Sequence, residues 1–208
     1  MNNKKFKVFL ILFGLTFLIC DMFSQKGYQL GYVHYDSTPK DTELHDLLIY
    51  NGIQGGMTYD IKLRELNYLQ TACLLSVSYN SSTDMLFDGT NSVNYRFNTI
   101  DNSISIPLQI KFIIPQTTNF NAFVFTGPTI MGCVARFGQT INIDTNQKGS
   151  FTYYDVPFKS RFTLFWGVGI GFAYRKVYIK GNYDLGILNP YKGIRSESFN
   201  IAIGKVLK

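Results

Sequence analysis

The chain has 208 residues, a length that suits a single domain. Only 16% of the residues are charged while 16% are aromatic, and the 14 Tyr and 18 Phe far outnumber the single Trp. This composition favours a β-rich chain at a membrane interface over a cytosolic enzyme. The formal net charge is +6, but Lys and Arg are spread thinly rather than clustered, so we expect no nucleic-acid partner.

The first residues have the composition of a secretory signal. Basic residues at Lys4, Lys5 and Lys7 precede an apolar run from Val8 to Leu15. That run is shorter than the ~20 apolar residues that a membrane-spanning helix needs. We therefore predict a signal peptide over residues 1–24, cleaved after Ser24, and a mature domain over residues 25–208. Lipoprotein processing at Cys20 is disfavoured because the large Ile19 precedes it.

Apolar and polar residues then alternate with a period of two. Between Ile53 and Leu63 the apolar side chains fall at odd positions and the polar ones at even positions. Segments 103–112, 162–174, 177–187 and 198–207 repeat the pattern, which predicts strands whose two faces meet unlike environments. We predict eight strands, at about residues 28–35, 51–63, 67–79, 101–113, 120–136, 160–174, 177–187 and 197–207.

The predicted connections alternate between short and long. Three short ones, 64–66, 114–119 and 175–176, alternate with longer polar segments at 80–100, 137–159 and 188–196. Outer-membrane barrels have short periplasmic turns and longer outer loops. The fold class we predict is therefore all-β: an eight-stranded antiparallel up-and-down transmembrane β-barrel in a bacterial outer membrane, closed because lipid leaves no partner for a free strand edge.

Strand alternation assigns side chains to the two faces of this barrel. Eight strands leave an interior just wide enough to be filled by side chains, so we expect a plugged lumen rather than a diffusion pore. Charged side chains expected in the lumen are Asp60, Lys62, Lys111, Lys180 and Asp184. Side chains expected to face lipid are Ile53, Tyr59, Ile61, Ile104, Ile106, Leu108, Ile110, Trp166, Val168, Ile170, Phe172, Ile201 and Ile203. An interfacial aromatic girdle is expected at Tyr28, Tyr32, Tyr59, Tyr79, Phe112, Phe123, Tyr174 and Tyr183.

Glycine, proline and cysteine add local expectations. Gly167, Gly169 and Gly171 are expected to face inward, where they let a narrow barrel curve and give room to longer side chains from across the lumen. Pro107 and Pro128 each remove a backbone donor within a strand, so we expect bulges there. Cys73 and Cys133 are expected on the outward face of non-neighbouring strands, as free thiols.

Three passages resemble the outer-membrane β-barrel family common in Bacteroidota, which includes PorT-like secretion-associated barrels. They are GIQGGMTYDIKL at 52–63 running into YLQT at 68–71, ISIPLQIKF at 104–112 followed by Gly127-Pro128, and GVGIGFAY at 167–174. The resemblance covers nearly the whole mature chain and implies the barrel fold, the outer-membrane location and, for PorT-like members, a part in protein secretion. It implies no shared catalytic residues. The chain departs from the pattern at its end, where Lys208 follows Leu207 in place of the terminal aromatic that commonly serves as an assembly signal.

No catalytic, cofactor or metal site is predicted. His34 lies near Asp36 and Ser37, but proximity in sequence does not establish a Ser/His/acid triad, which is recognised by geometry. His45 is the only other histidine, and the scattered acids show no metal-ligand spacing. A lipid-modifying enzyme remains an alternative that substitution of His34 and His45 would test.

The expected function therefore lies in the long outer loops, since loops on a rigid scaffold commonly carry recognition. We predict a non-enzymatic, monomeric barrel. Its expected partners are outer-membrane lipid, the barrel-assembly machinery during biogenesis, and a surface or secretion partner bound through the loops. A role in a PorT-like secretion system is the alternative within the family.

Overall fold

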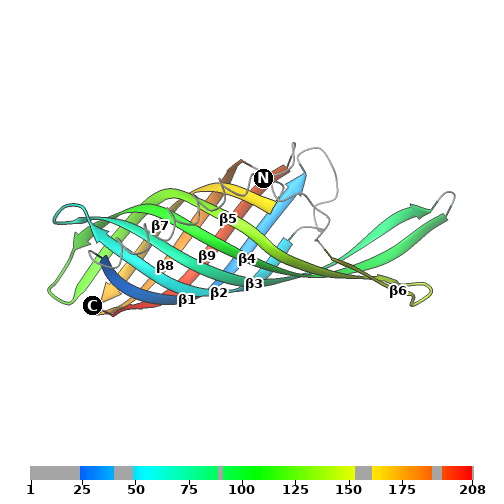
Figure 1. The fold of residues 1–208 in the computed structure, drawn as a ribbon, viewed down its shortest axis with the longest axis horizontal. Coiled ribbons are helices and arrows are strands. Elements are labelled where there is room, and N and C mark those ends of the chain that lie inside the picture. Colours follow the sequence, from blue (N-terminus) through cyan, green and yellow to red (C-terminus); the bar gives the residue numbers. More distant parts are fainter. Residues whose placement is uncertain (1–23, 40–48, 89–90, 153–160, 189–193, 208) are drawn as a thin grey trace, which may run out of the picture.

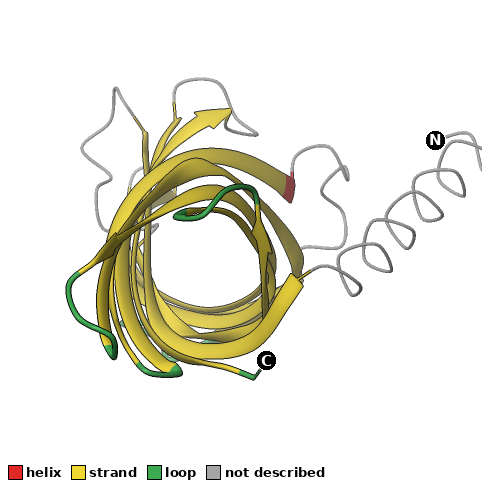
Figure 2. Ribbon diagram, turned by 90° about the vertical axis from the view of Figure 1, so that its left-hand side faces the viewer, coloured by secondary structure: helices red, strands yellow, loops and turns green. Residues whose placement is uncertain are grey.

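The computed structural model describes residues 24–39, 49–88, 91–152, 161–188 and 194–207, and they form one antiparallel sheet. Its strands are β1 (Ser24–Pro39), β2 (Ile49–Lys62), β3 (Asn67–Asp88), β4 (Asn91–Pro115), β5 (Phe120–Asn142), β6 (Lys148–Thr152), β7 (Phe162–Tyr174), β8 (Val177–Leu188) and β9 (Ile194–Val206). Eight of them, all but β6, form a closed ring, seen end-on in Figure 2. The predicted fold class and all eight predicted strands are confirmed.

The ring closes where the first and last strands of the chain meet. β1 pairs with β9 over thirteen residue pairs, from Gly27↔Val206 to Pro39↔Ile194. β4 pairs with β5 on the opposite side, which completes the circle. A closed ladder satisfies backbone N–H and C=O groups within the protein, the condition for crossing lipid. No helix in the described part of the chain is long and apolar enough to span a membrane.

The alternation in sequence becomes an alternation of burial. In β7 the even residues from Phe162 to Tyr174 are mostly exposed, while Thr163, Phe165, Gly167 and Gly171 between them are buried. A side chain in a strand points to the face opposite its neighbour's, so a period of two places one set outside the ring and one inside it.

Two of the predicted loops consist largely of strand. β3 continues to Asp88 and β4 begins at Asn91, and β5 continues to Asn142 before the additional strand β6. We call the part of the sheet formed by residues 80–88, 91–99, 137–142 and 148–152 the outer sheet. Figure 1 shows these strands on the right of the view, where they extend well beyond the ends of the other strands of the ring. The outer sheet was missed because its segments are rich in Ser, Thr and Asn, a composition typical of loops. The alternation of Val93, Tyr95 and Phe97 with polar residues could have indicated the strand in β4.

The β4–β5 and β7–β8 ladders each contain a register shift, and neither shift falls at a proline. The β4–β5 register shifts between Asn102 and Ser103, not at Pro107 or Pro128. The same ladder lacks partners at Leu108 and Gln109, opposite Gly127 and Pro128, without a change of register. The prediction of bulges at the prolines was therefore wrong: Pro128, which has no N–H, interrupts the ladder locally.

The remaining local expectations have mixed outcomes. Cys73 and Cys133 are free and lie on β3 and β5, which β4 separates. Cys133 continues the inward series of Thr129 and Met131, so its predicted outward orientation was wrong. Residues 1–23 of the predicted signal peptide, and His45, lie outside the described residues.

Candidate functional site

The outer wall of the ring is apolar. Most of the side chains predicted to face lipid are exposed on the outer wall: Ile53, Leu108, Ile110, Trp166 (50% exposed), Val168 (58%), Ile170, Phe172, Ile201 and Ile203. Three others are half-buried: Ile61, Ile104 and Ile106. Tyr59 departs from the prediction because it is only 6% exposed. Its hydroxyl lies 3.9 Å from Met57 Sδ, a contact along the wall.

Several exposed aromatic residues have their polar atoms bonded to a neighbouring strand. Tyr79 donates to Asn98 Oδ1 at 3.1 Å and Tyr183 donates to Glu197. Trp166 Nε1 donates to Thr126 Oγ1 at 3.1 Å. An apolar ring with a satisfied polar tip suits the membrane–water interface. The predicted girdle included Phe123, but that ring is fully buried in the lumen because Phe123 alternates inward along β5.

The lumen contains a chain of charged and amide groups next to the short turns. Lys111 Nζ lies 2.7 Å from Asp60 Oδ2, and Gln70 Nε2 donates to Asp60 Oδ1 at 2.7 Å. Lys180 Nζ donates to Gln70 Oε1 at 3.0 Å. Four strands (β2, β3, β4 and β8) therefore meet in one buried network, which we call the lower network. Lys62, which was also predicted in the lumen, is exposed because β2 ends there.

Aromatic rings pack against the lower network. Phe123, Phe125 and Tyr178 form the buried apolar cluster of the lumen. Lys111 Nζ lies 4.5 Å from the centre of the Phe123 ring, and Lys180 Nζ lies 5.2 Å from that of Phe125, distances at which a cation is attracted to the ring face. Side chains at Gly169 and Gly171 would collide with these two rings. The inward glycines do give larger side chains room, but the prediction that these come from across the lumen was wrong, because the two rings belong to the paired strand β5.

A second group of side chains lies further toward the outer sheet. Arg136 donates two hydrogen bonds to Asp101 Oδ2, and its guanidinium lies 5.2 Å from the centre of the Tyr50 ring. Tyr35 packs against both Tyr50 and Phe165, with ring centres 6.1 and 6.0 Å apart. We call these five residues the upper cluster.

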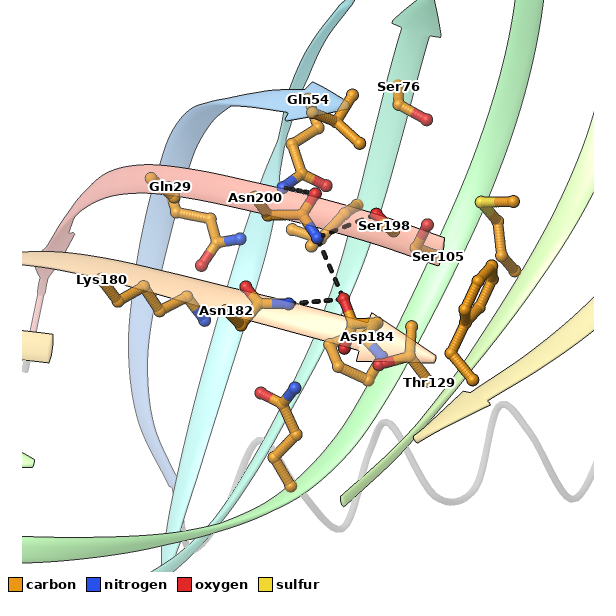
Figure 3. Close-up of a pocket in the computed structure, with 17 residues that line it drawn as sticks. Gln29, Gln54, Ser76, Ser105, Thr129, Lys180, Asn182, Asp184, Ser198 and Asn200 are labelled. Carbon is orange, nitrogen blue, oxygen red and sulfur yellow. Dashed lines mark hydrogen bonds between the residues drawn. The ribbon is translucent and has the colours of Figure 1, made fainter. Parts of the chain in front are cut away.

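A cavity of about 40 Å³, lined by every strand of the ring, includes Lys180 of the lower network and Phe165 of the upper cluster in its wall. Figure 3 shows its polar lining. Asp184 Oδ2 accepts hydrogen bonds from Asn182 at 2.5 Å and Asn200 at 3.0 Å, and Gln54 Nε2 donates to Asn200 Oδ1 at 3.0 Å. The volume is room for roughly three water molecules, at ~10–15 Å³ each. Side chains thus fill most of this part of the lumen.

Sequence reasoning named four of the buried charged groups but neither the amides that link them nor the upper ion pair. Asp101 continues the inward series of Ser103 and Ser105, so alternation alone could have indicated it. Arg136 could not be found this way, because the register shift next to Asn102 changes the face on which later β5 residues lie.

His34, which the alternative hypothesis of a lipid-modifying enzyme considered beside Asp36 and Ser37, has a different partner in the structure. His34 Nδ1 lies 2.8 Å from Asn51 Oδ1, while Ser37 Oγ lies 3.4 Å from Ser196 Oγ. His34 and Ser37 are three residues apart on one strand and therefore point to opposite faces. The structure does not bring the two together. Among the described residues, no group of three or more His, Cys, Asp or Glu side chains could hold a metal ion.

A closed antiparallel ring with apolar side chains outside and a polar, side-chain-filled interior defines the class of membrane-spanning β-barrels. The chain is an eight-stranded barrel of the bacterial outer membrane. In such barrels the short turns face the periplasm and the longer connections face the cell exterior, and this is the orientation that we expect here.

No protein-family model and no curated protein matches the chain. Solved structures of similar fold include Ail, the attachment invasion locus protein of Yersinia pestis (10% identity, 89% of this chain and 100% of that chain, TM-score 0.47). Others are Neisserial surface protein A (11%, 88% and 97%, 0.40) and the N-terminal β-barrel domain of Pseudomonas aeruginosa OprF (10%, 87% and 98%, 0.30). The fold assignment rests on the strand pairing of this chain, and the resemblance to the Bacteroidota family stays a prediction.

Proposed function

We propose that this chain is a non-enzymatic outer-membrane barrel that binds an extended peptide segment of an external partner along the outer edge of β3. The observation that carries the proposal is the continuation of β3 beyond its second neighbour. β2 pairs with β3 only as far as Asn51↔Tyr79, whereas β4 pairs with β3 as far as Asn91↔Asp88. Among the described residues, Ser81–Asp88 therefore has a neighbour on one side only.

Such an edge presents a row of backbone N–H and C=O groups. These groups bind an added strand through main-chain hydrogen bonds, with alternate side chains supplying selectivity. Asn98 accepts hydrogen bonds from Tyr79 and Ser81, which ties β3 to β4 where the outer sheet begins. The edge is thus held on a pre-formed sheet, which lowers the ordering cost of binding.

β6 provides a second, shorter edge. It pairs with β5 over five residues, Lys148 to Thr152, and all five are exposed. The β3 edge is longer, so we assign the partner to β3 and use the β5–β6 hairpin as the control.

The first test establishes which side the outer sheet faces. Single cysteines replacing Ser81 and Gln139 should react with a membrane-impermeant maleimide on intact cells, in a background in which Cys73 and Cys133 are replaced by Ser. A cysteine replacing Glu65, in the β2–β3 turn, should react only after the outer membrane is permeabilised. Labelling of the Glu65 position alone on intact cells would invert the orientation and contradict the proposal.

The second test addresses binding. Replacing residues 83–96 by Asn-Gly joins Ser82 to Phe97, which already face each other in register, so a two-residue hairpin turn fits. Peptides selected from a displayed library on the full protein in nanodiscs should bind the trimmed protein at least tenfold more weakly. N-methylation of the peptide backbone should also weaken binding.

The matched control shortens the other hairpin. Residues 141–148 replaced by Asn-Gly join Thr140 to Gly149, which are also paired. This variant should keep the affinity of the full protein. Equal binding to both trimmed proteins would remove the β3 edge as the site.

Two other functions are proposals with less support. The family resemblance suggests a role in secretion, which deletion of the gene and measurement of exported proteins would test. A lipid-modifying activity would need a nucleophile near His34, where Asn51 is the side chain found at Nδ1. Replacement of His34 by Ala, followed by analysis of membrane lipids, tests that function.

A further inference from the structure

Two buried oxygen atoms in the lumen cavity have no hydrogen-bond donor among the described residues. They are Asp184 Oδ1 and Gln109 Oε1, whose residues are 3% and 2% exposed. Both residues line the cavity. A buried acceptor without a donor costs about 1–3 kcal/mol, and more when the acceptor is charged, so two in one cavity indicate a missing partner.

Each of the two strands between these residues has a glycine at the same level. Asp184 pairs with Gly167 of β7, Gly167 pairs with Gly127 of β5, and Gly127 packs against the backbone of Leu108 and Gln109 in β4. A side chain at Gly167 would collide with Asp184 Oδ1. Asp184 Oδ1 therefore occupies the space that a side chain at Gly167 would need, and glycine there lets the carboxylate lie against the wall.

No cation of the described residues forms an ion pair with Asp184. Lys111 pairs with Asp60, and Arg136 pairs with Asp101. Lys180 lines the same cavity, but its ammonium donates to Gln70 and lies over the Phe125 ring. Lys180 and Asp184 both extend from β8 along the cavity, with Asn182 between them (Figure 3), and no ion pair or hydrogen bond joins the two side chains. A buried carboxylate that is not ion-paired is disfavoured.

We propose that the cavity binds one hard metal cation, with Asp184 Oδ1 and Gln109 Oε1 as protein ligands. Carboxylate, amide and hydroxyl oxygens are the donors that Na⁺ and Ca²⁺ accept, and the hydroxyls of Ser105 and Thr129 also line the cavity. The cavity volume leaves room for the ion with one or two retained waters. The ligands come from strands far apart in the sequence, which is why no ligand spacing was visible there.

The test measures the temperature at which the folded, fast-migrating gel band is lost. Protein in detergent is heated in chloride salts of Na⁺, of Ca²⁺ or of N-methylglucamine, an organic cation too large for the cavity, at equal ionic strength. A cation at ten times its dissociation constant should raise the midpoint by about 3 °C or more relative to N-methylglucamine. Whether Na⁺ or Ca²⁺ produces the shift identifies the ion.

Variants assign the shift to this cavity. Asp184→Asn and Gln109→Leu should each lose most of the shift, and Gln109→Glu should enlarge it because a second carboxylate joins the site. Asp144→Asn, which removes a carboxylate from the exposed β5–β6 turn, should keep the full shift. If Asp184→Asn does not fold, the two Gln109 variants carry the test.

Two results would overturn the proposal. One is an equal midpoint for the wild-type protein in all three salts. The other is a shift that persists in Gln109→Leu and Asp184→Asn. A more stable Asp184→Asn with no cation response in the wild type would show that a proton, not a metal ion, neutralises Asp184.

Discussion

At the residue scale, the lower network shows how the barrel contains charge inside its wall. Asp60 accepts from Lys111 and Gln70, and Gln70 in turn accepts from Lys180. Each charged group therefore has a hydrogen-bonded partner, and each ammonium also lies over an aromatic ring. Buried pairs of this kind add little stability compared with apolar residues of the same size, but removing one partner leaves a charge that nothing compensates.

Replacing Lys111 by Met should therefore destabilise the barrel by about 3–5 kcal/mol. The double variant Lys111→Met with Asp60→Asn should recover most of that loss, because no buried carboxylate is left without its cation. Unfolding by urea in lipid vesicles, followed through the fluorescence of the single Trp166, measures the change. Lys176→Met, in the exposed β7–β8 turn, is the control and should stay within about 0.5 kcal/mol. Equal stability of the single variant and the control would contradict the assigned role of the ion pair.

The sequence was sufficient to place Asp60, Lys111, Lys180 and Asp184 inside the barrel, because alternation fixes the face on which a strand residue lies. It could not show which of them pair. Asp60 and Lys111 belong to β2 and β4, so their contact crosses β3 and depends on the curvature of the ring. Tyr59 shows the limit of the same rule, since it is buried although its position alternates with the inward residues Thr58 and Asp60.

At the element scale, β5 combines a regular membrane strand with local irregularities. Gly127 has a positive φ of 153°, precedes Pro128, and approaches the backbone of Leu108 closely, where the β4–β5 ladder is interrupted. A residue with a side chain meets both a disfavoured backbone conformation and a steric collision there.

Gly127→Ala should consequently cost about 1–3 kcal/mol. Gly181→Ala is the matched control, because a methyl group there would have its nearest atom, the Asn200 carbonyl oxygen, at 3.6 Å, and no positive φ is involved. The temperature at which the folded gel band is lost should fall for the first variant and stay nearly constant for the second. A larger loss at Gly181 would show that the backbone conformation and close contact at Gly127 do not require glycine.

The outer sheet is the element that sequence reasoning interpreted least well. Membrane strands are recognisable in the sequence because their two faces meet different surroundings, which makes apolar and polar residues alternate. A strand outside the membrane can have water on both faces. β6 is exposed at all five residues. Its strand structure depends on pairing with β5, a tertiary contact that hydropathy does not encode.

At the scale of the whole molecule, the barrel reverses the usual relation between exposure and polarity. Ile170 is 52% exposed, and in a water-soluble protein such a residue would tolerate a charge. Here it lies four residues from the end of β7 at the short β7–β8 turn, which places it about 10 Å into the wall, at 3.3 Å per residue and a strand tilt of ~40°.

Ile170→Lys should therefore cost about 2–4 kcal/mol in lipid vesicles, the range for a basic residue near the bilayer midplane. Leu66→Lys, at an equally exposed position in the β2–β3 turn, should change stability by less than about 0.5 kcal/mol. Urea unfolding of the two variants, side by side in vesicles, gives the comparison. A cost of Ile170→Lys no greater than that of Leu66→Lys would mean that this wall does not contact acyl chains.

The pairing of β1 with β9 also determines when the ring can close in the cell. Since β1 is the first strand of the sheet and β9 the last, β9 must be synthesised and exported before β1 can pair with it. Contacts so distant in sequence form slowly, and until they form both unpaired edges of the sheet can pair with other partly folded copies of the protein. A product truncated before Ile194 would never lose those edges, so quality control in the periplasm should favour its proteolysis over its insertion.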